Sequence, residues 1–126
     1  MSDFSITFFA ALSDPTRLRA LFLLAARGEL CVCRLVEALG VSQPKMSRHL
    51  AFLRDAGIVR DRRAGQWVHY RVNEDLPDWA RQVLTTSAAA MAADLPYRGD
   101  LARLGSGTAR TGGAAQAGTG AGAMPC

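Results

Sequence analysis

The chain has little of what an enzyme active site is usually built from. It contains only two histidines, and it has no Cys-x-x-Cys pair, glycine-rich phosphate loop or paired-carboxylate site. Its 126 residues suffice for one domain with a small core, but not for a two-layer enzyme of ordinary size. We therefore expect a protein that is not an enzyme and that uses no organic cofactor.

Long apolar runs are also missing. No stretch approaches the roughly 20 apolar residues of a membrane span, and the Met-Ser-Asp start lacks the basic and apolar regions of a secretion signal. We therefore expect a cytoplasmic protein with no membrane partner. In that reducing compartment three cysteines, an odd number, do not indicate a disulfide framework. The sequence therefore predicts that these cysteines act as thiols.

The excess positive charge lies in one stretch of thirty residues. Residues 42–71 carry seven basic and two acidic side chains, whereas the segments before and after them are nearly balanced. A local basic stretch is typical of a nucleic-acid-binding surface, but an ordinary solvated basic face gives the same pattern. Charge alone does not separate these two interpretations.

Capping residues and the spacing of apolar residues predict five helices. Ser-Asp-Pro at 13–15 is a helix start signal. Ser42 is the predicted N-cap of the fourth helix, along which Met46, Leu50 and Leu53 form one apolar stripe. The predicted helices cover residues 2–12, 15–27, 33–39, 43–56 and 77–93.

A β-hairpin is predicted after the fourth helix. Residues 58–63 and 66–72 flank Ala64-Gly65, a turn that contains glycine. After Gly105 the sequence consists mostly of Gly, Ala, Thr and Ser, which cannot bury enough apolar area to offset the ordering of the backbone. We predict one domain, residues 1–95, followed by a disordered Gly/Ala-rich tail, residues 96–126.

Two helices joined by a short glycine-containing turn and followed by a basic hairpin have the order of a winged helix-turn-helix. The predicted fold class is mainly α with a β-hairpin wing (α+β). The helix over 43–56 would enter the major groove, and the hairpin would reach phosphates or the minor groove. The predicted DNA-contacting residues are Ser42, Gln43, Lys45, Ser47, Arg48 and His49 on the helix, and Arg62, Arg63 and Gln66 on the hairpin.

Two alternatives qualify this prediction. His49 could equally pack at the edge of its helix. The whole unit could be a small helical domain whose hairpin is only a cap. We favour DNA binding because charge, turn and helix face agree.

Four segments of the chain are more specific than the fold. They are ALSDPTRLR at 11–19, ELCVC at 29–33, VSQPKMSRHL at 41–50 and GQWVHYR at 65–71. Together they resemble the arsenical-resistance repressors of the ArsR/SmtB family, and the resemblance covers about residues 4–93. It implies a homodimer held by the first and last helices, and repression of a resistance operon that a metalloid relieves.

Cys31 and Cys33 lie at the start of the first helix of the DNA-binding unit. Thiolates select soft ions such as trivalent arsenic and antimony, and Cys33, near a helix N-terminus and followed by Arg34, should have a lowered pKa. Residues two apart on a regular helix point about 200° away from each other, so chelation by both must hold the segment out of regular helix. We therefore predict that arsenite or antimonite binding competes with DNA binding.

The identity of a third metalloid ligand stays open. Many relatives have a third cysteine where this chain has Val36, and the resemblance implies that two are enough for induction. Cys126 could reach the site on a flexible tail, although a free tail thiol is the simpler interpretation.

Other functions remain in competition. The two cysteines could be small buried hydrophobes. A repressor of the same fold could instead sense oxidation through Cys31 or Cys33. Different classes of protein, a thiol-dependent arsenical-handling enzyme or a passive metalloid buffer, would not bind a specific DNA sequence.

Overall fold

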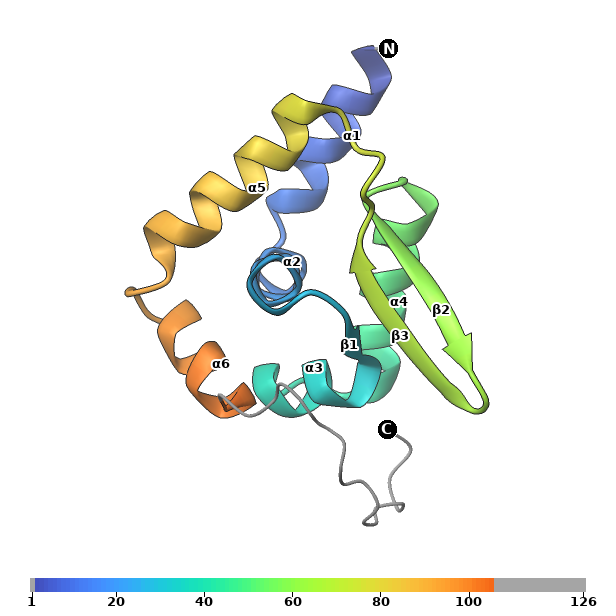
Figure 1. The fold of residues 1–126 in the computed structure, drawn as a ribbon, viewed down its shortest axis with the longest axis vertical. Coiled ribbons are helices and arrows are strands. Elements are labelled where there is room, and N and C mark those ends of the chain that lie inside the picture. Colours follow the sequence, from blue (N-terminus) through green and yellow to red (C-terminus); the bar gives the residue numbers. More distant parts are fainter. Residues whose placement is uncertain (1, 106–126) are drawn as a thin grey trace.

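The computed structural model describes residues 2–105, which form helices and a small antiparallel sheet around one core (Figure 1). The helices are α1 (Ser2–Leu12), α2 (Pro15–Arg27), α3 (Val32–Leu39), α4 (Gln43–Asp55), α5 (Asp78–Met91) and α6 (Tyr97–Leu104). The strands are β1 (Leu30–Cys31), β2 (Val59–Ala64) and β3 (Trp67–Val72). The predicted mainly α fold with a hairpin wing is confirmed.

Helix α2 is the centre of the molecule and contacts each of the other helices and β3. Figure 1 shows it end-on, with α1 and α5 on one side and α3, α4 and the hairpin on the other. The Asp14 carboxylate caps α2 by accepting a hydrogen bond from the Arg17 backbone N–H (3.0 Å), and Pro15 occupies the first turn. Leu21, Leu23 and Leu24 are almost fully buried in the core. This start signal was therefore interpreted correctly from the sequence.

The sheet has one strand more than predicted. Its order is β1-β3-β2, and all neighbours are antiparallel. In β1, Leu30 pairs with Tyr70 and Cys31 pairs with His69. The sequence predicts only a loop before α3, because two residues are too few to show a strand periodicity. Pairing with the hairpin supplies backbone partners for this short apolar segment.

Helix α6 corrects the predicted domain boundary. Its residues belong to the predicted disordered tail, yet they pack against α2 and α3. Tyr97, Leu101 and Leu104 recur at helical spacing, and Leu104 is buried. The stripe is only two turns long, so it does not stand out from the Gly/Ala-rich sequence that follows. The prediction for residues 106–126, including Cys126, lies outside the described residues.

Buried polar contacts hold α6 in place. The Asp100 carboxylate is 1% exposed and accepts hydrogen bonds from Arg19 of α2 and from Arg103. The Arg103 guanidinium also donates to the backbone carbonyl of Ala38 in α3 (2.7 Å). Helix α6 thus connects the central helix to the end of α3. Within residues 2–105 no helix has the length and apolar character needed to cross a membrane.

Candidate nucleic-acid interface and cysteine segment

Helix α4 presents a polar face to solvent because its apolar stripe is buried. Met46, Leu50 and Leu53 are completely buried. The Ser42 hydroxyl oxygen accepts a hydrogen bond from the backbone N–H of Lys45 (3.3 Å) and so caps the helix, as predicted. The predicted DNA-contacting residues that are exposed here are Ser42, Gln43, Lys45, Ser47 and Arg48. The structure therefore places these five on the exposed N-terminal half of α4.

His49 differs from its neighbours on α4. Its side chain is only 18% exposed, its Nε2 lies 3.8 Å from the Asp14 carboxylate, and its Nδ1 lies 3.4 Å from the Arg17 guanidinium. Burial lowers the pKa of His49 below its ordinary value, against the opposing effect of Asp14. The structure therefore places His49 in the contact between α2 and α4, the helix-edge position that was one of its two predicted roles.

The hairpin faces α4 across a groove of about 340 Å³. Gln43 and Ser47 of α4 line one side, and Arg63 and Gln66 of the hairpin line the other; Cys31 also contributes to the lining. Arg63 and Gln66 are exposed. Residues from both predicted DNA-binding elements therefore meet at one surface, although 16 or more positions separate them in the sequence.

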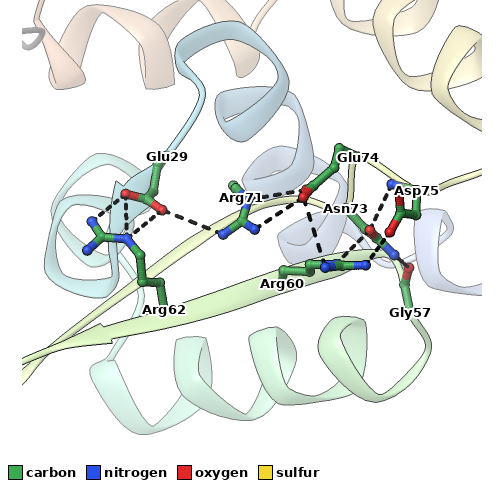
Figure 2. Close-up of polar contacts among 8 residues, drawn as sticks. All are labelled: Glu29, Gly57, Arg60, Arg62, Arg71, Asn73, Glu74 and Asp75. Atoms are coloured by element: carbon green, nitrogen blue, oxygen red, sulfur yellow. Dashed lines mark hydrogen bonds and ion pairs between the residues drawn. The ribbon is translucent and has the colours of Figure 1, made fainter.

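Arg62 is not free in the structure. It lies on β2 opposite His69, and its guanidinium forms hydrogen bonds with both carboxylate oxygens of Glu29, the closest at 2.6 Å. Figure 2 shows this pair at one end of a chain of polar contacts that continues through Arg71 and Glu74 to Arg60. The pairs of Glu29 with Arg62 and Arg71 have no local sequence signal, because their partners come from different elements.

These ion pairs neutralise much of the basic segment. Acidic side chains pair with each of four arginines in it: Arg54, Arg60, Arg62 and Arg71. Lys45, Arg48 and Arg63 form no ion pair with another residue of the described part of the chain. The basic side chains of this segment that remain available to bind an external anion therefore lie on the N-terminal half of α4 and on the hairpin.

The two cysteines lie where the sheet meets α3. Cys31 is the last residue of β1, has an extended backbone (φ −73°, ψ 150°) and is 9% exposed. Cys33 is in the first turn of α3 and is half-buried. The predicted geometric obstacle to chelation, two cysteines within one regular helix, does not arise here because Cys31 precedes the helix.

The surroundings of the cysteine pair bear on its chemistry. The Arg34 guanidinium is directed toward α6, where it donates a hydrogen bond to the backbone carbonyl of Leu104 (2.8 Å). No group of three or more His, Cys, Asp or Glu side chains that could hold a metal ion is found within residues 2–105. A site in this part of the chain would therefore rest on Cys31 and Cys33, and Cys126 lies outside it. Both cysteines are disulfide-bonded in the structure, which corrects the expectation of two thiols, so they can bind a soft ion only after reduction.

Helices α1 and α5 share an apolar surface, which we call the apolar patch (Ile6, Phe9 and Trp79). Ile6 is 73% exposed and Phe9 is 50% exposed, and the Phe9 and Trp79 rings stack with centroids 5.9 Å apart. The N-terminal end of α5 lies beside α1 in Figure 1, on the opposite side of α2 from α3. Exposed apolar surface of this kind is typical of an interface between proteins.

Comparisons with known proteins agree with these features. The model of the family "Bacterial regulatory protein, arsR family" matches residues 14–61. An arsenic resistance transcriptional regulator of Pseudomonas putida is 56% identical over 82 residues, which are 65% of this chain and 71% of that protein. The arsenical resistance operon repressor of Escherichia coli is 52% identical over 79 residues, 63% of this chain and 68% of that protein.

A solved structure extends the comparison to the fold. It is the homodimeric winged helix-turn-helix DNA-binding domain of a possible ArsR-family transcriptional regulator from Mycobacterium bovis. It superposes with a TM-score of 0.60 at 27% identity, over 70% of this chain and 78% of that one.

Proposed function

Since the chain belongs to the arsR family of bacterial regulatory proteins, we propose that it represses transcription as a homodimer on operator DNA until arsenite or antimonite binds Cys31 and Cys33. The exposed residues of α4 would read bases in the major groove, where Gln43 can pair with adenine and Lys45 or Arg48 with guanine or phosphate. Arg63 and Gln66 of the hairpin would contact phosphates or the minor groove. The repressor acts in the cytoplasm and has no catalytic role.

One observation carries the proposal: the cysteine segment belongs to both DNA-binding elements. Cys31 pairs with His69 of the wing, and Cys33 lies in the first turn of α3, which packs against the α4 helix. An ion that draws these two residues together therefore acts on the wing and on the helix-turn-helix at once. Because binding free energies are reciprocal, operator DNA must weaken arsenite binding by the same factor by which arsenite weakens DNA binding.

In the protein reduced by an external thiol, Cys31 and Cys33 would hold arsenite by thiol exchange. Two As–S bonds would form and two As–O bonds would break, and each leaving hydroxide would take the proton of one thiol and depart as water. The third position on arsenic keeps a hydroxide or takes a small thiol. Antimonite follows the same scheme, because it is also a soft ion that prefers sulfur. The extended backbone at Cys31 supports this step, because it frees that residue from the spacing of a regular helix.

The apolar patch supports the proposed dimer. It lies on α1 and α5, the first helix and the last of the predicted helices, and away from the proposed DNA surface. The Mycobacterium bovis domain of similar fold is homodimeric. A symmetric pairing through this surface would bury Ile6 and Phe9 of both subunits and present two recognition helices to successive half-sites.

The test is a DNA-binding measurement on reduced protein. Fluorescence anisotropy of a labelled duplex from the protein's own promoter is followed at fixed salt while arsenite, and separately antimonite, is added. Wild type and Cys126→Ser should release the duplex, whereas Cys31→Ser and Cys33→Ser should remain bound. Cys126→Ser is the matched control, because it removes one thiol without touching the segment between α2 and α3.

Other outcomes would change the assignment. Loss of the response in Cys126→Ser would make the tail cysteine a third ligand. Release by peroxide without metalloid would favour the oxidation sensor. Failure of the wild type to prefer its promoter duplex over a scrambled one would contradict the repressor function altogether.

A further inference from the structure

Glu29 forms an ion pair with Arg62, one of the predicted DNA-contacting arginines. It precedes β1, and its carboxylate accepts hydrogen bonds from Nε and Nη2 of Arg62, with the closest distance 2.6 Å. The Glu29 side chain is 30% exposed and that of Arg62 is 52% exposed. A second cation, Arg71, lies 3.8 Å from the same carboxylate (Figure 2). Two nitrogen atoms of Arg62 thus bind the Glu29 carboxylate, and the arginine is the more exposed partner of the pair.

The chemistry of this contact resembles that of a phosphate contact. The planar fork of an arginine binds carboxylate and phosphate oxygens in the same two-pronged way. One guanidinium face cannot hold both anions in that geometry at once.

We propose that Glu29 is a built-in competitor of DNA phosphate for Arg62, so that this arginine contacts the DNA backbone only when the carboxylate releases it. The inference rests on the proposed function, because it assigns a regulating residue to the hairpin that is proposed to contact DNA. Arg62 is adjacent to Arg63 on β2, and successive side chains of a strand point to opposite faces, so the Arg62 guanidinium lies on the face of the hairpin opposite to the groove beside α4.

The position of the competitor connects it to the inducer segment. Glu29 stands two residues before Cys31, and β1 pairs with β3, which in turn pairs with the strand of Arg62. In register, Cys31 lies opposite His69 and His69 lies opposite Arg62. The carboxylate that holds the wing arginine is therefore carried by the segment that contains the proposed metalloid ligands.

The test compares two substitutions of equal charge. Glu29→Gln removes the competitor, whereas Glu37→Gln removes the same charge from an exposed position on α3 that has no ion pair within the described residues. Affinity is measured against salt concentration for the promoter duplex and for a scrambled duplex of equal length. Glu29→Gln should bind both about two- to fivefold more tightly at fixed salt, the range of an exposed ion pair.

The salt dependence distinguishes a new contact from a general change of charge. One added phosphate contact should steepen the slope of log affinity against log salt by about 0.9 in Glu29→Gln, and the slope of Glu37→Gln should match the wild type. In a double-mutant cycle, the gain should disappear when Arg62→Gln is combined with Glu29→Gln. Thermal unfolding of each variant verifies that it is folded.

Two results would overturn the inference: equal slopes for Glu29→Gln and Glu37→Gln, or a gain that persists without Arg62. Because phosphate contacts do not depend on sequence, the scrambled duplex decides this point even if the promoter duplex shows no preference. Failure of the proposed function would appear separately, as a wild type that does not distinguish the two duplexes.

Discussion

At the scale of single residues, the basic side chains on the proposed DNA-binding surface differ in whether they form ion pairs with acidic side chains. Arg60, Arg62 and Arg71 of the wing have acidic partners, whereas Arg63 of the wing and Lys45 and Arg48 of α4 have none within residues 2–105. An unpaired cation at an exposed position can bind phosphate without first breaking an internal contact. The contribution of a basic residue to DNA binding should therefore follow its pairing and not only its charge.

This sorting predicts different effects for two arginines. Arg48→Ala should weaken DNA binding and reduce the salt slope by about 1, because it removes one phosphate contact. Arg60→Ala should change the slope much less, since Arg60 is held by Asp75 and Asn73. Anisotropy titrations at several salt concentrations measure both. Equal slopes for the two variants would show that ion pairing does not select the contacts.

The two histidines predict how stability depends on pH. Burial lowers the pKa of His49 and of His69, so in the folded protein each imidazole resists protonation. Near pH 6.5 and just below it, the unfolded chain binds more protons than the folded one, so the free energy of unfolding decreases as the pH falls through this range. Above pH 7 the contribution is fully present.

Urea unfolding at a series of pH values between 5 and 8 tests this expectation. The wild type should lose stability toward pH 5, and a His49→Gln, His69→Gln double variant should show a flatter curve over the same range. A wild type that becomes more stable on acidification in this range would contradict the assigned direction of the two pKa shifts.

At the scale of elements, α6 holds α2 and α3 together. Its Arg103 binds the end of α3, and its buried Asp100 binds Arg19 of α2. Asp100→Ala should lower the free energy of unfolding by about 1–3 kcal/mol, because two guanidinium groups lose their shared acceptor and one of them is only 21% exposed.

Asp94→Ala provides the control for this element. Asp94 lies on the connection between α5 and α6, and its side chain is exposed. Its loss should change the unfolding free energy by less than about 0.5 kcal/mol. If Asp100→Ala were equally harmless in chemical denaturation, α6 would not be part of the cooperative domain.

At the scale of the whole molecule, the apolar patch and the DNA surface lie on different sides. Ile6→Glu should leave the subunit folded, since this side chain is 73% exposed, but it should place a charge in the proposed dimer interface. The dimer should dissociate, and operator affinity should fall by about 100-fold or more because half-sites are then bound singly.

Sedimentation velocity and operator titration measure the two effects together. Leu95→Glu is the matched control, because Leu95 is 67% exposed and lies outside the apolar patch, in the connection before α6. It should remain dimeric and bind normally. A monomeric Ile6→Glu that binds the operator like wild type would remove the dimer from the proposed mechanism.

Local sequence determined most of the architecture of this protein. Asp14-Pro15 and Ser42 are caps that act within one turn, the stripe through Met46, Leu50 and Leu53 is a property of a single helix, and Ala64-Gly65 is a turn of its own hairpin. Each depends on residues close together in the chain, so it could be predicted without the fold. The exposed face of α4 follows from the same stripe.

Only the tertiary structure decided what connects these elements. The strand at Cys31 exists because β3 lies beside it. Helix α6 is ordered because α2 and α3 cover its two apolar turns. Arg62 forms an ion pair because Glu29 reaches it from another segment. None of these has a local signal, since each needs a partner more than 30 positions away. The roles of Cys31 and Cys33 themselves stay predictions, because a soft ion adds bonds that neither a short sequence pattern nor the folded chain contains.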